Sequence, residues 1–331
     1  MSNYLNKTLA VNISTNQLKS FCRLVVTSFV LFHSAKTVAA APDLQAAVNQ
    51  QTKPAHWSGL PLLAEEATKR GHELPLPIGV SLFYNNIDAD YVADNDFQVQ
   101  VDGGLLGFRG PNDYVIPAED VSITGSDRSV QLKIDAWILP FWNVYALLGY
   151  TEGRKDIRAK LDNVEGLPCD DACNGIVLPI PIEYTAKNYG IGTVLAGQID
   201  PIIGDTPVIV MAVGAIVNAN TDTTDSVIKT KLASIRVGQR YDIGSDKLAW
   251  FLGFSHQSVN QNVTGDYSFV GTDLAPLMEE VKFDIDLAKK ETKNMSVSLN
   301  YDFGHRNEWN LYAEYGFLNW QHLIIGVGRR F

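Results

Sequence analysis

Hydrophobic and polar residues alternate through much of the chain after residue 77, and the clearest case is its last ten residues. In a strand every second side chain lies on the same face. One face of this segment carries Leu323, Ile325, Val327 and Phe331, and the other carries Gly326, Gly328 and Arg330. A tilted strand of about ten residues is long enough to cross a membrane. The pattern therefore predicts a membrane-spanning strand that closes a β-barrel.

Nine earlier segments repeat this alternation. They occupy residues 78–84, 130–138, 144–150, 189–195, 209–215, 233–237, 248–254, 295–303 and 309–315. In the fifth of them we expect Ile209, Met211, Val213 and Ala215 to form the face toward lipid. The longest apolar stretch, 208–217, is too short for a membrane-spanning helix but long enough for a strand. We predict an all-β, antiparallel, up-and-down transmembrane barrel of about ten strands over residues 77–331, with eight or twelve strands as alternatives.

The connections between these segments favour the same architecture. Brief joints near residues 140, 201, 244 and 305 alternate with longer connections at 87–127, 154–185, 220–227 and 258–292. Short periplasmic turns and long extracellular loops are typical of outer-membrane barrels. A secreted β-sandwich would show the same alternation, but aromatic residues gather at the strand ends, as they do at a membrane interface.

The first long connection is not featureless. Phe97, Val99 and Val101 alternate within it. That pattern predicts either strands that extend beyond the membrane or an additional pair of strands, and the sequence leaves both open.

The first 76 residues show no strand pattern. Lys19 and Arg23 precede an apolar segment at 24–32, and small residues follow at 38–40. This arrangement predicts a secretory signal peptide over residues 1–40. Residues 41–76 are expected to form a periplasmic leader. A short helix within 58–71 that enters the barrel mouth and a leader without fixed structure are the two interpretations of that segment.

The charge balance excludes nucleic acid as a partner. The chain has 37 acidic and 27 basic residues. Four of the basic residues and none of the acidic ones lie in residues 1–40, which leaves 23 basic against 37 acidic residues after that segment. Binding to phosphate backbones needs a basic surface. The expected partners are outer-membrane lipid, lipopolysaccharide and the barrel-assembly machinery. We expect a monomer with no cofactor and no metal site.

One hairpin and the C-terminus carry a family resemblance. Residues 135–145, followed by Gly149-Tyr150-Thr151-Glu152-Gly153, resemble a hairpin of a family of small proteobacterial outer-membrane β-barrels, most of which have no assigned function. The terminal Phe331, with Leu323, Ile325 and Val327 before it, resembles the C-terminal assembly signal of such barrels. The resemblance implies a barrel fold and a location in the bacterial outer membrane. It supplies no catalytic residues.

Charged residues also occur on the polar faces of the predicted strands. They are Lys133, Asp135, Arg236, Arg240, Asp302 and Glu314. Because charges in lipid are costly, these side chains should face the barrel lumen. They would form either the selective rings of a pore or a packed, self-neutralising polar core, which small barrels favour. We prefer the packed core.

One pair of residues has the composition of an enzyme site. His256 and Ser258 share a strand face, which is similar to the lipid-facing dyad of outer-membrane phospholipase A. The Asn-Gly-Arg segment expected after such a serine is missing, because Val259-Asn260 follow instead. We therefore predict a non-enzymatic barrel with a structural, surface-interaction or narrow-channel role. A porin-like transporter of small solutes and a lipid-facing hydrolase remain as alternatives.

Two cysteines follow the predicted signal peptide. Cys169 and Cys173 are separated by three residues. In an exported protein this spacing predicts a disulfide that closes a small loop.

Overall fold

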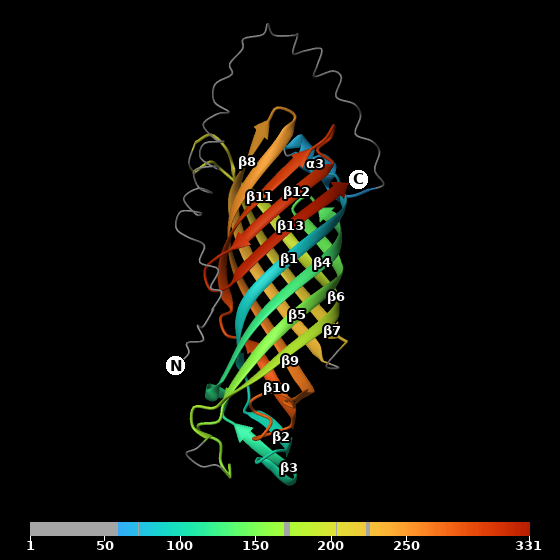
Figure 1. Cartoon of the computed structure of the whole chain (residues 1–331). Helices are drawn as coiled ribbons and strands as arrows, with labels where there is room; N and C mark the ends of the chain where they lie inside the picture. The colour runs from blue at the N-terminus through green and yellow to red at the C-terminus, as the bar shows by residue number, and fades with distance from the viewer. Residues whose placement is uncertain (1–58, 72, 169–172, 203, 223–225) are drawn as a thin grey trace, which may run out of the picture. The chain divides into compact units, whose positions relative to one another are not determined.

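Ten strands pair edge to edge into a closed ring (Figure 1). The computed structural model describes residues 59–331, except residues 72, 169–172, 203 and 223–225. The predicted signal peptide therefore lies outside the described residues. Around the ring the strands are β1 (Ile78–Ala93), β4 (Val121–Leu139), β5 (Trp142–Lys160), β6 (Val177–Ile199), β7 (Val208–Thr221), β8 (Val227–Ile243), β9 (Asp246–Ser268), β11 (Lys293–Phe303), β12 (Trp309–Gly316) and β13 (Gln321–Arg330). The ring closes where β13 pairs antiparallel with β1, from Gly79 opposite Arg330 to Asp88 opposite Gln321. The predicted fold class and strand number are confirmed.

The outer surface of the ring is apolar over the height of a membrane. On β5 the outward-facing Trp142 and Tyr150 stand about eight residues apart, and Leu148 between them is exposed. A tilted strand crosses the hydrocarbon layer in about 9–11 residues. On β13 the outward positions are Leu323, Ile325 and Val327, all exposed. Arg329, which interrupts this face, lies 5.1 Å from the ring centres of both Trp309 and Phe331. No helix among the described residues is long and apolar enough to cross a membrane.

Beyond the membrane-spanning part, the apolar face of each long strand changes sides. In β1, Leu82 and Tyr84 point outward and are exposed, whereas Tyr91 and Ala93 point inward and are buried. The pairing of β1 with β4 continues through this region without a break in register. The change of face therefore follows from the sequence of β1, in which the apolar residues first occupy even-numbered and then odd-numbered positions. The part of each long strand near the C-terminal end of the barrel suits lipid outside, and the part that extends away from it suits water outside.

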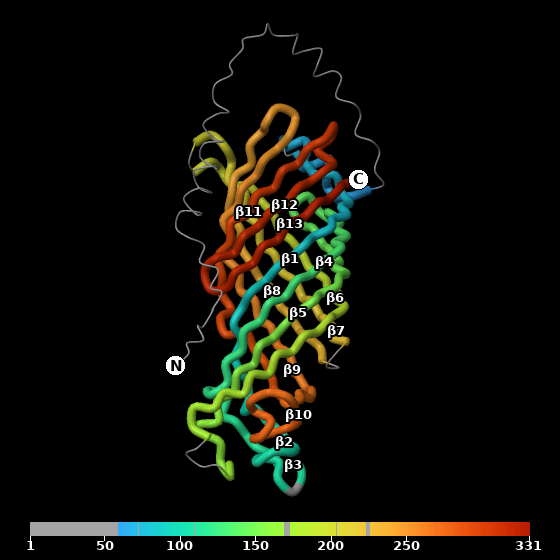
Figure 2. Tube along the Cα trace, viewed as in Figure 1, coloured from blue at the N-terminus to red at the C-terminus, as the bar shows by residue number. Residues whose placement is uncertain are grey.

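The outer half contains three additional strands. They are β2 (Phe97–Gly103), β3 (Gly107–Ile116) and β10 (Glu280–Lys289), and a 3-10 turn, η1 (Ala118–Asp120), follows β3. The sheet continues from β9 through β10 and β2 to β3, and the end of β1 also pairs with β10. Figures 1 and 2 show these strands as an extension at the end opposite the C-terminus. Both interpretations of Phe97, Val99 and Val101 are therefore met, because strands extend beyond the membrane and a strand pair is added.

The inner face of this extension is a packed apolar core. Its fully buried side chains include Phe97, Leu106, Ile116, Ile157, Leu178, Ile180, Met278, Ile285 and Leu287. These residues come from β5 and β6 of the ring, from the additional strands β2, β3 and β10, and from the β2–β3 and β9–β10 connections. The core therefore fills the space inside the extracellular end of the barrel.

The segment before β1 crosses the other mouth of the barrel. Its one helix among the described residues is α3 (Ala64–Lys69), which lies within the predicted 58–71. The N–H of Leu62 donates to the carbonyl of Ile138 at the end of β4. Glu73 then forms an ion pair with Lys247 at the start of β9, five ring positions away. Arg330 donates to the carbonyl of Leu76, just before β1. The described residues before β1 thus contact the wall at β4, at β9 and at β13.

The prediction for the inner and outer faces of β7 is wrong. Ile216 pairs with Ile191, and both are exposed on the outer surface. Met211, Val213 and Ala215, with the opposite parity, therefore point into the barrel. The reason is that residues 208–217 are apolar at nearly every position, so that alternation cannot distinguish the two faces. Pairing with β6 decides the direction.

Candidate functional site: the barrel lumen

The six charged residues predicted to face the lumen take part in three clusters. Arg236 lies 2.8 Å from Glu314, and Arg240 lies 2.7 Å from Asp302. Each of these pairs joins β8 to a strand that is not its neighbour, so the contacts run through the interior. The third cluster contains Lys133 and Asp135, 3.5 Å apart. Pairing of this kind is what a buried charge requires.

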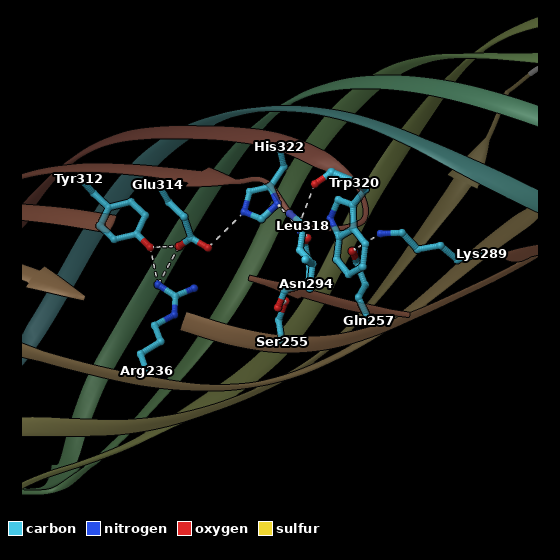
Figure 3. Close-up of polar contacts among 10 residues, drawn as sticks. All are labelled: Arg236, Ser255, Gln257, Lys289, Asn294, Tyr312, Glu314, Leu318, Trp320 and His322. Carbon is cyan, nitrogen blue, oxygen red and sulfur yellow. Dashed lines mark hydrogen bonds and ion pairs between the residues drawn. The ribbon is translucent and has the colours of Figure 1, made fainter. Parts of the chain in front are cut away.

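The Arg236 cluster joins β8 to β12 and β13 (Figure 3). Glu314 accepts bonds from Arg236 and from the hydroxyl of Tyr312, and its other oxygen lies 3.2 Å from Nε2 of His322. Tyr312 also contacts Arg236. The His322 ring packs against the backbone of Gly316, where any side chain would collide with it. Glycine at position 316 therefore makes room for the histidine.

Asn294 extends this network to the extracellular rim. It is fully buried, donates to the carbonyl of Trp320, and accepts from the N–H groups of Leu318 and Asn319. A single amide side chain thus fixes the short turn between β12 and β13. Figure 3 shows it between His322 and Trp320.

The Asp135 cluster lies near the periplasmic mouth. Asp135 is buried and accepts from Arg330, 2.8 Å away, and from Asn143, 2.7 Å away. Lys133 approaches the same carboxylate, so two cations share it. The alternation of β13 had placed Arg330 on the inner face with Gly326 and Gly328, which is the signal that could have added it to the predicted set.

Two further lysines lie where the lumen meets the outer core. Lys155 is buried, 3.2 Å from Asp127 and 4.1 Å from the ring centre of Tyr91, and Tyr184 donates to the same aspartate. Lys289 of β10 donates to Gln257 and lies 3.3 Å from the ring centre of Trp320. Burial lowers the pKa of Lys289 to about 7. Alternation did not reveal these residues, because their role depends on the change of face along the strands.

The remaining predicted sites lie elsewhere. His256 is exposed and Ser258 partly exposed on the outer face of β9, and no hydrogen bond joins them within the described part of the chain. Cys173 is buried, but Cys169 lies outside the described residues, so the disulfide stays a prediction. Between residues 59 and 331, leaving aside the gaps, no group of three or more His, Cys, Asp or Glu side chains is placed to hold a metal ion.

Solved structures of outer-membrane barrels are similar in arrangement. The β domain of the Bordetella autotransporter BrkA covers 78% of this chain and 100% of its own, with 9% identity and a TM-score of 0.33. The outer membrane protease OmpT from Escherichia coli covers 78% and 99%, with 11% identity and a TM-score of 0.39. The translocator domain of the autotransporter NalP from Neisseria meningitidis covers 80% and 92%, with 11% identity and a TM-score of 0.35. No family model and no curated protein matches the sequence.

The closed ring, its apolar outer belt and its charged interior together identify the kind of protein. It is a β-barrel of the bacterial outer membrane. The resemblance to one particular family of small barrels stays a prediction, since no family model matches.

Proposed function

We propose that this protein is a non-conducting outer-membrane barrel that presents a rigid binding surface outside the cell. The observation that carries this proposal is the apolar core in the extracellular half. Inward-facing side chains such as Phe97, Ile157 and Ile285 are fully buried there. An ion on that route would lose its water without gaining polar contacts, which costs many kcal/mol. A porin needs a continuous polar path, so the core argues against the porin alternative.

The binding surface is the tip of the extension. The N–H groups of Leu105 and Leu106 donate to the carbonyls of Pro276 and Leu277, which joins the β2–β3 connection to the loop before β10. Leu106 is buried at this junction. Phe108, two residues after Leu106, and Val270, in the connection between β9 and β10, are each 69% exposed. Exposed apolar side chains at the outer end of a domain are a common feature of interaction sites.

Conductance tests the first half of the proposal. The refolded protein is inserted into planar bilayers, and the heat-modifiable gel shift of a folded barrel is checked on the same sample. Folded protein without discrete openings is the expected result. Regular openings would contradict the proposal and return the porin alternative.

Site-directed photocrosslinking tests the second half. A photoreactive residue replaces Phe108 at the tip, and a control variant carries it at Asp113 of the same strand. Living cells should give a discrete adduct from position 108 and none from position 113. Equal adducts at both positions, or none at either, would refute a specific surface at the tip.

A further inference from the structure

The inner wall of the membrane-spanning part is divided into a polar side and an aliphatic side. The polar side carries the three charged clusters described above, on β8, β11, β12, β13 and β4. The aliphatic side is formed by β5, β6, β7 and the neighbouring part of β8. Its inward-facing side chains are Leu147, Val194, Met211, Val213, Val217 and Leu232.

The inward direction of these residues rests on one close contact. The ring of Tyr145 lies over the backbone of Gly192, and a Cβ on that glycine would meet the ring at 2.2 Å. The ammonium group of Lys133 lies 5.4 Å from the ring centre of the same tyrosine, Tyr145. Gly192 pairs with Ala215, so Ala215 and its alternate neighbours Val213 and Val217 share the inner face.

The aliphatic side borders open space. Its members are only half-buried, although they point inward. The inward-facing residues of the outer core, such as Ile157 and Ile180, are fully buried. Water thus reaches the aliphatic side chains within the lumen, and each Å² of apolar surface removed from water would contribute about 25 cal/mol. This surface is suited to a hydrocarbon chain.

The polar side offers donors that the protein does not use. Lys133 is 25% exposed, and within the described part of the chain its ammonium makes no hydrogen bond beyond the 3.5 Å ion pair with Asp135, which already accepts from Arg330. Nε of Arg236 and Oγ of Ser234 are buried and have no hydrogen-bond partner among the residues that the structure describes. In the three charged clusters, four cations face three carboxylates. The unbalanced charge is positive, so this side is suited to an anion.

We propose that the lumen binds a single-chain amphiphile with an anionic head group. The head group lies at Lys133, with Arg236 behind it, and the chain lies along β5, β6 and β7. Tyr145 stands between the two sides, beside both the ammonium and the Gly192 backbone. Because the apolar core lies at the other end, the ligand enters from the periplasmic mouth, beside the residues before β1 that contact the wall there. This site is independent of the surface proposed above.

Photolabelling with dodecanoate that carries a diazirine at its chain end tests this site. The refolded protein is reconstituted in phosphatidylcholine vesicles, irradiated with the probe and mapped by mass spectrometry. Adjacent residues of β7 provide an internal control, because Met211 and Val213 face the lumen while Ala212 and Ile216 face lipid. Bound probe should label Met211 and Val213, and an excess of plain dodecanoate should abolish that labelling. Labelling at Ile216 should persist, because it reports probe dissolved in the bilayer.

Charge recognition is tested with Lys133→Met. Loss of the ammonium should weaken the competition curve about tenfold, as expected for one charge-assisted contact. Lys229→Met, which removes an exposed lysine from the outer face of β8, should leave it unchanged. Val213→Asp should abolish lumenal labelling by placing a charge on the aliphatic side. Dodecanol, the neutral analogue, should compete at least tenfold less well than dodecanoate.

Three results would overturn the proposal. The first is labelling confined to lipid-facing residues. The second is equal competition by dodecanol and dodecanoate, and the third is an unchanged curve for Lys133→Met in a protein that keeps its gel shift. None of these results bears on conductance or on the tip of the extension.

Discussion

Arg236 of β8 lies 2.8 Å from Glu314 of β12, although two strands of the ring separate them. Their contact runs through the lumen, and it ties together two parts of the barrel wall that are not neighbours in the sheet. Tyr312 and His322 satisfy the remaining oxygen capacity of the carboxylate. Polar contacts across the interior therefore help to hold the strands of the barrel together.

Arg236→Met should destabilise the barrel by about 3–5 kcal/mol, because it leaves Glu314 buried without its cation. The measurement is equilibrium unfolding in urea, followed by tryptophan fluorescence in lipid vesicles. Arg154→Met is the control, since the Arg154–Asp156 pair is 52% and 39% exposed and should contribute less than about 1 kcal/mol. The double variant Arg236→Met, Glu314→Met should recover most of the loss. Equal effects of Arg236→Met and Arg154→Met would contradict the assignment.

Gly316→Ala should displace His322. A Cβ at this position would lie 2.1 Å from the imidazole and 2.8 Å from the amide nitrogen of Asn294. We expect a loss of about 1–3 kcal/mol from overpacking, measured by the same unfolding assay. Gly214→Ala is the matched control, because a Cβ there meets only the side chain of Thr193 at 3.9 Å. Similar stability of the two variants would refute the packing of His322 on Gly316.

Lys289 should make stability depend on pH. Its pKa, lowered by burial to about 7, lies below the ordinary value near 10.5 that it regains on unfolding. Between these values the unfolded chain holds more protons, so stability should rise as the pH increases from about 7 to about 10.5. Lys289→Met should remove this slope. At pH 6 it should also stabilise the protein by roughly 2–4 kcal/mol. This figure is what remains of the cost of burying the charged lysine once the lost contacts with Gln257 and Trp320 are subtracted.

Unfolding midpoints measured across that pH range check the prediction for Lys289. Lys282→Met, which replaces an exposed lysine of the same strand, should leave the profile unchanged. An identical slope in Lys289→Met and the parent protein would show that another group is responsible.

The two faces of β7 can be distinguished with arginine. Ala212→Arg places the charge in lipid and should cost about 2–4 kcal/mol or prevent insertion. Val213→Arg places it in the lumen, where water reaches the side chain, and should cost less. Refolding yield into vesicles, scored by the gel shift, gives the comparison. The reverse order would restore the orientation that the sequence alone suggested.

Much of the candidate site was accessible from alternation. A charged residue such as Asp135 in an otherwise apolar strand has to face inward, because lipid excludes it. Its partners could not be identified in this way. Arg330 lies 195 residues away in the chain and approaches only because β13 closes on β1. The burial of Lys155 and Lys289 could not be predicted either, because the sequence does not show where along the strands the polar lumen ends and the apolar core begins.

The sequence by itself determined the membrane-spanning strands and the polar nature of the lumen, because a strand between lipid and a charged interior needs period-two alternation. It predicted the number of strands as about ten, with eight or twelve as alternatives, and the structure decided for ten. Only the tertiary structure decided the direction of β7, whose residues are apolar on both faces and depend on their partner strand for orientation. It also decided that the apolar residues of the outer half meet as a core that closes the barrel. The core forms because side chains from strands far apart in the sequence meet in the same space, and the local pattern of apolar residues cannot predict such contacts.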